Sequence, residues 1–255
     1  MLLIFTPFSR TGSTSLARAL GSCGLKMLFE PFNGSLNKQP VHYWRSEIKS
    51  LSLTHPFNEA FYKIKEMGFN GIKHLASHEH DYNNKALLRM CDKIIFIHRK
   101  HFIDRYLSRW MSEKFEHPKP AKGQHIGNYN LGSIWRWSDI YYAPSTKKAF
   151  YTQIRPPVNI TLMKKEFKKY TVEYNMYYPL LLSENAIMLE YATFYNESVK
   201  ENFIELASHA ELDIISDEWE AVLDHKNKFN DPNTYRKVIP NYEEVMSYRD
   251  EMVIE

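Results

Sequence analysis

The sequence predicts an α/β fold with a central parallel sheet of about five strands. Two observations predict it. Short apolar runs alternate with helical patterns along the chain, which is typical of βαβ units. The run Ile94–Ile97 is also β-branched and aromatic, as a strand covered on both faces requires. Because ligands of such sheets bind beyond the carboxyl ends of the strands, we expect the functional residues there.

The expected elements follow in order. Leu2–Thr6 is a short apolar run that ends at a proline turn, and Ser13–Gly24 carries leucines at helical spacing and ends at a glycine. The predicted helix Pro56–Met67 begins at a proline and is ended by Gly68. The other expected strands are Lys26–Phe29, Gly71–Leu75, Lys93–His98 and Ala186–Glu190. The other expected helices are Pro56–Met67, Asn83–Cys91, His101–Glu116, Thr161–Tyr178 and Ser198–Leu212.

The length and composition indicate one globular domain over residues 1–255. A chain of 255 residues with 44% hydrophobic and 25% charged residues has enough apolar material for a normal core. Prolines and glycines gather in the polar stretch His117–Ser133, which predicts a loop, and we expect a lid or substrate segment near 117–182. The aromatic and basic stretch Trp135–Arg155 fits either a sugar-stacking wall or core.

Charge and cysteine content exclude several classes of protein. The balance of 33 basic and 30 acidic side chains gives a net charge of +3, which argues against a nucleic-acid partner. The two cysteines provide neither a disulfide framework nor metal-ligand spacing, and His78–Asp81 reads as a solvated turn rather than a metal site. No apolar run is long enough for a signal core or a membrane span, so we expect a cytoplasmic protein.

A loop rich in hydroxyl groups joins the first strand to the first helix. Such a loop gathers backbone N–H groups around one point, where an anion binds. A glycine lets the backbone approach closely, an arginine adds fixed charge, and the hydroxyls add donors, although an ordinary polar helix cap is the simpler alternative. The predicted anion-binding residues are Ser9, Arg10, Thr11, Gly12, Ser13, Thr14 and Ser15.

This loop differs from the phosphate loop of ATP- and GTP-hydrolysing enzymes. In the pattern G-x-x-x-x-G-K-[ST], the lysine contacts the terminal phosphates and the last hydroxyl binds Mg²⁺. Here Pro7 takes the place of the first glycine and Ser13 that of the lysine. The strand that should end in a metal-binding aspartate instead ends at His98 and Arg99. Both features that support a metal ion are missing from the motif.

The run Ser9–Leu16 resembles the 5′-phosphosulfate loop of sulfotransferases that use 3′-phosphoadenosine 5′-phosphosulfate (PAPS), in its carbohydrate-type form. Ile94–Arg99 followed by Asp104–Trp110 resembles the segment whose Arg and Ser bind the 3′-phosphate of the donor, here Arg99 and Ser108. Ser108 lies one position further from Arg99 than family members usually place it. Segments with weaker similarity to the family are Leu28–Phe32, Met188–Tyr191, and the stretch from Tyr235, Arg236 and Lys237 to Glu244.

The resemblance implies a P-loop NTPase-like three-layer α/β/α fold that takes PAPS as donor and needs no metal. It implies that Arg10 stabilises the leaving phosphate, that Arg99, Ser108, Tyr235, Arg236 and Lys237 contact the donor, and that Glu30 is the general base. His74 is the rival base, and Lys73 could reach the sulfuryl group. The acceptor would be a hydroxyl compound, with glycans and small molecules as candidates.

Two alternatives stay open. A divergent P-loop kinase would use the loop for ATP with Mg²⁺. A non-catalytic module that binds glycans or RNA would instead use the stretch Trp135–Arg155, and would not need Arg10 or Arg99.

Overall fold

A computed structural model describes residues 1–32, 57–114, 151–224 and 232–254. The chain divides into two compact units, Met1–Lys100 with Tyr170–Asn227 and His101–Lys169 with Lys228–Glu255. The single domain over 1–255 stays a prediction. Of the predicted segment near 117–182, residues 117–150, which include the predicted loop His117–Ser133, lie outside the described residues.

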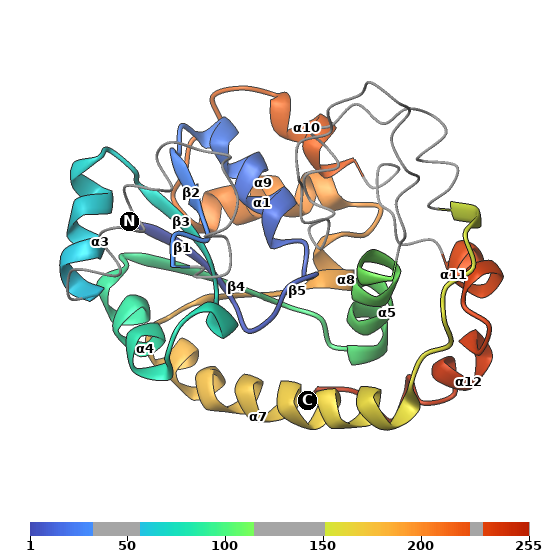
Figure 1. The fold of residues 1–255 in the computed structure, drawn as a ribbon. Helices are drawn as coiled ribbons and strands as arrows, with labels where there is room; N and C mark the ends of the chain where they lie inside the picture. The colour runs from blue at the N-terminus through green and yellow to red at the C-terminus, as the bar shows by residue number, and fades with distance from the viewer. Residues whose placement is uncertain (33–56, 115–150, 225–231, 255) are drawn as a thin grey trace, which may run out of the picture. The chain divides into compact units, whose positions relative to one another are not determined.

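The first unit is built on a five-stranded, all-parallel sheet with the strand order β2-β3-β1-β4-β5 (Figure 1). The α/β fold and the parallel sheet of about five strands are therefore confirmed. Each strand begins within one residue of its predicted start and ends at its predicted end. The strands are β1 (Leu2–Thr6), β2 (Met27–Phe29), β3 (Gly71–Leu75), β4 (Lys93–His98) and β5 (Ile187–Glu190).

Helices flank this sheet. Figure 1 shows α1, α9 and α10 over one face of the sheet and α3, α4 and α7 over the other. The helix α7 (Ile160–Ser183) contributes its residues from Tyr170 onward to the first unit. The other elements of this unit are α1 (Ser13–Ala19), η1 (Leu20–Cys23), α3 (Phe57–Glu66), η3 (Ala76–His78), α4 (Asp81–Met90), α8 (Tyr191–Phe194), α9 (Val199–His209) and α10 (Glu218–Leu223).

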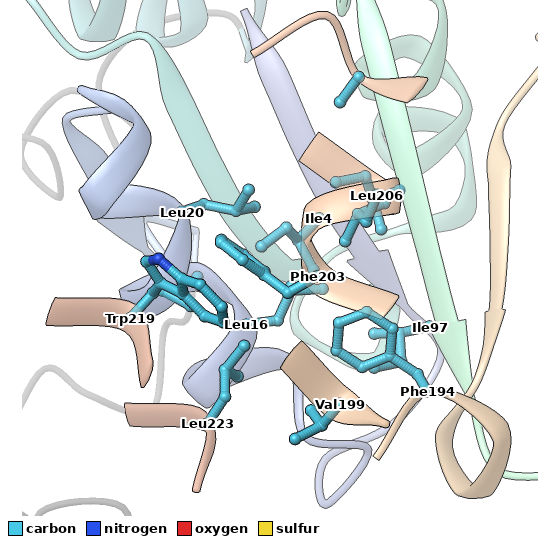
Figure 2. Close-up of a cluster of buried hydrophobic side chains, with 14 of the residues drawn as sticks. Ile4, Leu16, Leu20, Ile97, Phe194, Val199, Phe203, Leu206, Trp219 and Leu223 are labelled. Carbon is cyan, nitrogen blue, oxygen red and sulfur yellow. The ribbon is translucent and has the colours of Figure 1, made fainter. Parts of the chain in front are cut away.

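Alternate residues of the central strands pack into two separate cores, one on each face of the sheet. Ile4 and Ile95 join a cluster that includes Leu16 of α1, Phe203 of α9 and Trp219 of α10 (Figure 2). The rings of Phe203 and Trp219 stack with their centroids 4.7 Å apart. Each fully buried side chain of this size contributes roughly 1.5–3 kcal/mol of transfer free energy. This cluster fixes α1, and with it the loop that precedes α1, against the sheet.

The opposite face of the sheet is covered by aromatic residues of α7. Phe5 of β1 meets the ring of Tyr177 edge to face at 5.1 Å, and Phe96 of β4 lies 5.8 Å from the ring of Tyr174. Tyr177 also bonds α4, because Asn84 donates to its hydroxyl at 2.8 Å. The pleat of each central strand therefore sends neighbouring side chains into different layers.

The central strand β1 is the point where the strand order reverses. It pairs with β3 on one side and β4 on the other. The chain leaves β1 through α1 on one face of the sheet and leaves β3 through α4 on the other face. In open parallel sheets, ligands bind beyond the carboxyl ends of the strands at such a switch point. The loop that follows β1 occupies this position.

The second unit contains α5 (Phe102–Glu113), the first turns of α7, α11 (Pro232–Val238) and α12 (Tyr242–Met246). The C-terminal segment holds the start of α5, since the Phe102 N–H donates to the Met252 carbonyl at 3.0 Å. Two hydrogen bonds from the Arg249 guanidinium to the Asp104 carboxylate, at 3.1 and 3.0 Å, add to this contact.

Across the described ranges of both units, no helix has the length and apolar character needed to cross a membrane.

Candidate functional site

The carboxyl ends of the strands bring several predicted residues to one edge of the sheet in the first unit. The predicted anion loop follows β1, Glu30 follows β2, and Arg99 follows β4. His74 is the next-to-last residue of β3. Because all five strands run in the same direction, these positions share one edge. This edge is the candidate site.

The loop after β1 has an unusual backbone conformation. Arg10 has φ 71° and Gly12 has φ 80°, so both residues lie in the left-handed region. A residue other than glycine in this region is uncommon and occurs often at ligand-binding sites. Backbone that alternates between hands turns successive N–H groups toward one concave side, which is the geometry of anion-binding nests. Half-buried Arg10 adds a positive charge to this loop.

Thr11 lies between these two residues and is fully buried. Its hydroxyl has no hydrogen-bond partner among the residues that the structure describes. A buried hydroxyl without a partner costs about 1–3 kcal/mol. A ligand oxygen that accepted from Thr11 would remove this cost, so this hydroxyl fits an anion-binding loop.

Gly12 is enclosed by two tyrosine rings. The Tyr195 hydroxyl donates to the Gly12 carbonyl at 2.6 Å, and the same carbonyl accepts the first helical hydrogen bond of α1 from the Leu16 N–H at 3.1 Å. A Cβ atom on Gly12 would lie 2.4 Å from Cε2 of Tyr195 and 2.9 Å from Cε2 of Tyr191. The position therefore requires glycine for its positive φ and for the space around it.

Arg99 is 5% exposed and is held by two tyrosines. Its guanidinium carbon lies 3.6 Å from the centroid of the Tyr191 ring, and its carbonyl accepts a hydrogen bond from the Tyr170 hydroxyl at 3.0 Å. The Tyr170 ring in turn lies 4.7 Å from the ring of Phe8 in the loop after β1. Aromatic contacts therefore join Arg99 to the predicted anion loop.

Glu30 forms a buried ion pair with Lys73 of β3, and both side chains are at most 5% exposed. The Glu30 N–H also donates to the Lys73 carbonyl at 2.7 Å, and Glu30 itself has φ 52°. Nδ1 of His78 lies 3.8 Å from Oε2 of Glu30. Desolvation lowers the pKa of His78 despite this carboxylate, so a neutral imidazole stands beside the pair at neutral pH.

His74 is fully buried and belongs to a different hydrogen-bond network. Its Nε2 lies 2.7 Å from Oδ1 of Asn84, whose amide group donates to the Ala76 carbonyl at 2.9 Å and to the Tyr177 hydroxyl. Because this amide oxygen can only accept, Nε2 of His74 carries the proton. Desolvation lowers the pKa of His74 to about 4. The His74 side chain is therefore a neutral donor inside the fold, and its role as a base stays a prediction.

Four predicted donor contacts lie in the second unit. Ser108 is buried on α5, and Tyr235 is buried on α11. Arg236 is exposed and its Nε donates to the Glu243 carboxylate at 2.6 Å, while Lys237 is also exposed. The roles of these four residues stay predictions.

Sequence reasoning missed the support that Tyr191 and Tyr195 give to the site, and the pairing of Lys73 with Glu30. The two tyrosines are four residues apart immediately after β5, and their ring centroids lie 4.8 Å apart. Aromatic residues directly beyond a strand of a parallel sheet were the available signal. The lysine pairing had no comparable signal, because 43 residues separate the two partners.

No group of three or more His, Cys, Asp or Glu side chains in residues 1–32, 57–114, 151–224 and 232–254 is arranged to hold a metal ion. Comparisons with protein-family models, with curated proteins and with solved structures find no match to this chain.

Proposed function

We propose that this protein is a PAPS-dependent sulfotransferase on a P-loop NTPase-like, three-layer α/β/α fold. It moves a sulfuryl group from PAPS to an acceptor hydroxyl, for which a carbohydrate is one candidate. The observation that carries the proposal is the pairing of the left-handed loop after β1 with Arg99 after β4 at one edge of the sheet. A donor with phosphates at both its 5′ and 3′ positions needs two such cationic contacts.

In this proposal the loop holds the 5′-phosphosulfate. Backbone N–H groups of the loop, the Thr11 hydroxyl and the Arg10 guanidinium bind the phosphate oxygens, and Arg99 binds the 3′-phosphate. As the sulfuryl group leaves, negative charge develops on the oxygen that bridged sulfur and phosphorus. Cationic and N–H donors already in position stabilise this charge without reorganisation. Adenosine 3′,5′-bisphosphate is the leaving group and takes the electron pair of the broken S–O bond.

Glu30 is the general base in this proposal. It accepts the proton of the acceptor hydroxyl as the new S–O bond forms. The buried contact with Lys73 fixes the orientation of the carboxylate and balances its charge. Its left-handed backbone at the end of β2 fits a residue held in place for function. His74 is a weaker candidate because it is fully buried and desolvation lowers its pKa to about 4, which makes it a poor proton acceptor.

The kinase alternative receives less support from the same residues. Ser13 stands where a lysine would contact the terminal phosphates, and it is buried at the first position of α1. Strand β4 ends at His98 and is followed by Arg99, with no aspartate at this point to hold Mg²⁺. Kinase activity therefore serves as the contrary outcome of the test.

The test is isothermal titration calorimetry in EDTA, with adenosine 3′,5′-bisphosphate and ATP as ligands. We expect the bisphosphate to bind without Mg²⁺, and we expect Arg10→Gln and Arg99→Gln each to weaken that binding at least tenfold. The matched control is Lys65→Gln, an exposed lysine near Asp92 at the amino edge of the sheet, which should bind as the unmodified protein does. Binding of ATP with Mg²⁺ and no binding of the bisphosphate would replace this proposal with the kinase.

Turnover is tested separately. Labelled PAPS incubated with pooled glycans, lipids and small alcohols identifies the acceptor class by transfer of label. With that acceptor, Glu30→Gln should abolish turnover and leave the affinity for adenosine 3′,5′-bisphosphate unchanged, because its proposed role is proton transfer. Full turnover in this variant would assign the base to another residue.

A further inference from the structure

The contact between Arg99 and Tyr191 has a consequence for nucleotide selectivity. We propose that Tyr191 is the positioning residue that holds Arg99 for a second phosphate, so that the site selects a nucleotide with two separate phosphates over one that carries only a 5′-phosphate. This inference rests on the proposed function, because Arg99 must face the nucleotide. It adds a residue that the phosphate-binding motif does not contain.

The stacking geometry suits this role. The guanidinium carbon of Arg99 lies 3.6 Å from the centroid of the Tyr191 ring, so the contact uses the face of the guanidinium. The N–H donors of a guanidinium lie in its plane and point outward from its edge. A face contact therefore restricts the rotation of the side chain without competing for the hydrogen bonds that a phosphate accepts. Tyr170 restricts the same residue through its backbone by donating to the Arg99 carbonyl.

The Tyr191 ring is itself held in place. Tyr191 is the first residue of α8, and the preceding Glu190 caps this helix by accepting from the Thr193 N–H at 2.7 Å and from the Lys100 N–H at 3.2 Å. The cap therefore ties the start of α8 to the residue that follows Arg99. The ring of Tyr191 also packs on the ring of Tyr195 at 4.8 Å.

Tyr195 connects Tyr191 to the loop after β1. Its hydroxyl donates to the Gly12 carbonyl, and burial raises the pKa of this hydroxyl well above its usual value, so it keeps its proton. Tyr191 thus lies between the loop proposed for the 5′-phosphate and the guanidinium proposed for the 3′-phosphate. Loss of its ring should release Arg99 and leave the loop glycine bound to Tyr195. The expected effect is therefore selective for ligands that carry the second phosphate.

The experiment compares the binding of adenosine 3′,5′-bisphosphate and adenosine 5′-monophosphate by calorimetry. The readout is the dissociation constant of the monophosphate divided by that of the bisphosphate. Tyr191→Leu should reduce this ratio roughly tenfold, the size of a desolvated cation–π contact. Tyr191→Phe keeps the ring and should stay within about threefold of the unmodified protein. On an Arg99→Gln background, Tyr191→Leu should cause no further change in the ratio.

Three outcomes overturn the inference. The first is a ratio in Tyr191→Leu equal to that of the unmodified protein. The second is an equal loss of affinity for both ligands, which would assign the ring to support of the loop. The third is a reduction of the ratio by Tyr191→Leu that persists on the Arg99→Gln background. If Tyr191→Leu does not fold, Tyr191→Met provides a second side chain without a ring and is read in the same way. Failure of the unmodified protein to bind the bisphosphate refutes the proposed function itself, which separates the two failures.

Discussion

Replacement of Gly12 by alanine tests the geometry of the loop directly. The new Cβ would lie 2.4 Å from Cε2 of Tyr195 and 2.9 Å from Cε2 of Tyr191, and the backbone would keep φ +80°. A left-handed conformation costs a residue with a Cβ about 1–2 kcal/mol. Forcing an extra carbon into a packed contact costs about 1–3 kcal/mol. We therefore expect Gly12→Ala to lower the free energy of unfolding by about 3 kcal/mol.

The assay is urea unfolding followed by circular dichroism, with thermal unfolding as a second measure. For a chain of this size, a loss of about 3 kcal/mol lowers the melting temperature by roughly 6–12 °C. Gly21→Ala is the matched control, because no atom lies within 4 Å of a Cβ there and its φ is not positive. This control should be neutral or stabilising by up to about 1 kcal/mol.

A double variant tests the steric cause. Tyr195→Leu removes the closest ring atom that the new Cβ would meet and leaves Cε2 of Tyr191 at 2.9 Å, so Gly12→Ala on that background should cost less than the loss of about 3 kcal/mol expected in the unmodified protein. A Gly12→Ala protein within about 0.5 kcal/mol of the unmodified one, the range of neutral surface changes, would refute the reasoning. An equal loss in Gly21→Ala would refute it as well.

Two further predictions concern buried titratable groups. Lys73→Met leaves the Glu30 carboxylate buried without its ammonium partner, so the free energy of unfolding in urea should fall by about 3–5 kcal/mol. The double variant Lys73→Met/Glu30→Leu should recover most of this loss, and the exposed control Lys168→Met should leave the stability unchanged. A neutral Lys73→Met would contradict the buried pair. For His74, the folded pKa of about 4 lies below the ordinary value of 6.5, so the unfolded chain binds the proton first. Its contribution to stability is then complete above about pH 6.5 and is lost as the pH falls toward about 4, up to about 3 kcal/mol in total. Urea midpoints across this range should fall less steeply in His74→Gln, and an unchanged slope would contradict the buried neutral state.

The sequence was sufficient to predict the strands and the edge of the sheet that the loop after β1 shares with Arg99. Apolar runs such as Leu2–Thr6 are recognisable locally, and parallel direction alone places their carboxyl ends together. Helix ends were less predictable. The helix predicted to stop at Tyr178 continues through Pro179 to Ser183, because tertiary packing outweighs the bond that proline removes and Leu181 is fully buried.

Contacts between distant segments were beyond local reasoning. The strand order was not predicted, and neither was the hydrogen bond from Tyr195 to Gly12 across 183 residues. The pairing of Glu30 with Lys73 depends on β2 and β3 being neighbours in register, with Phe29 opposite Lys73. Such contacts follow from the assembled sheet, whereas periodicity and turn chemistry report only on neighbours in the chain.

The tyrosines that support the candidate site are synthesised after the residues that they contact. Residues 1–100 contain the loop, Glu30 and Arg99, and they leave the ribosome well before Tyr191 and Tyr195 are made. Until the chain beyond β5 arrives, the Gly12 carbonyl lacks its tyrosine and Arg99 lacks the ring on which it stacks. A nascent or truncated chain that ends before residue 191 therefore carries the predicted anion-binding residues without the tyrosine contacts that support them. The residues of the candidate site are synthesised first, and their supporting contacts form only after the chain beyond β5 has been made.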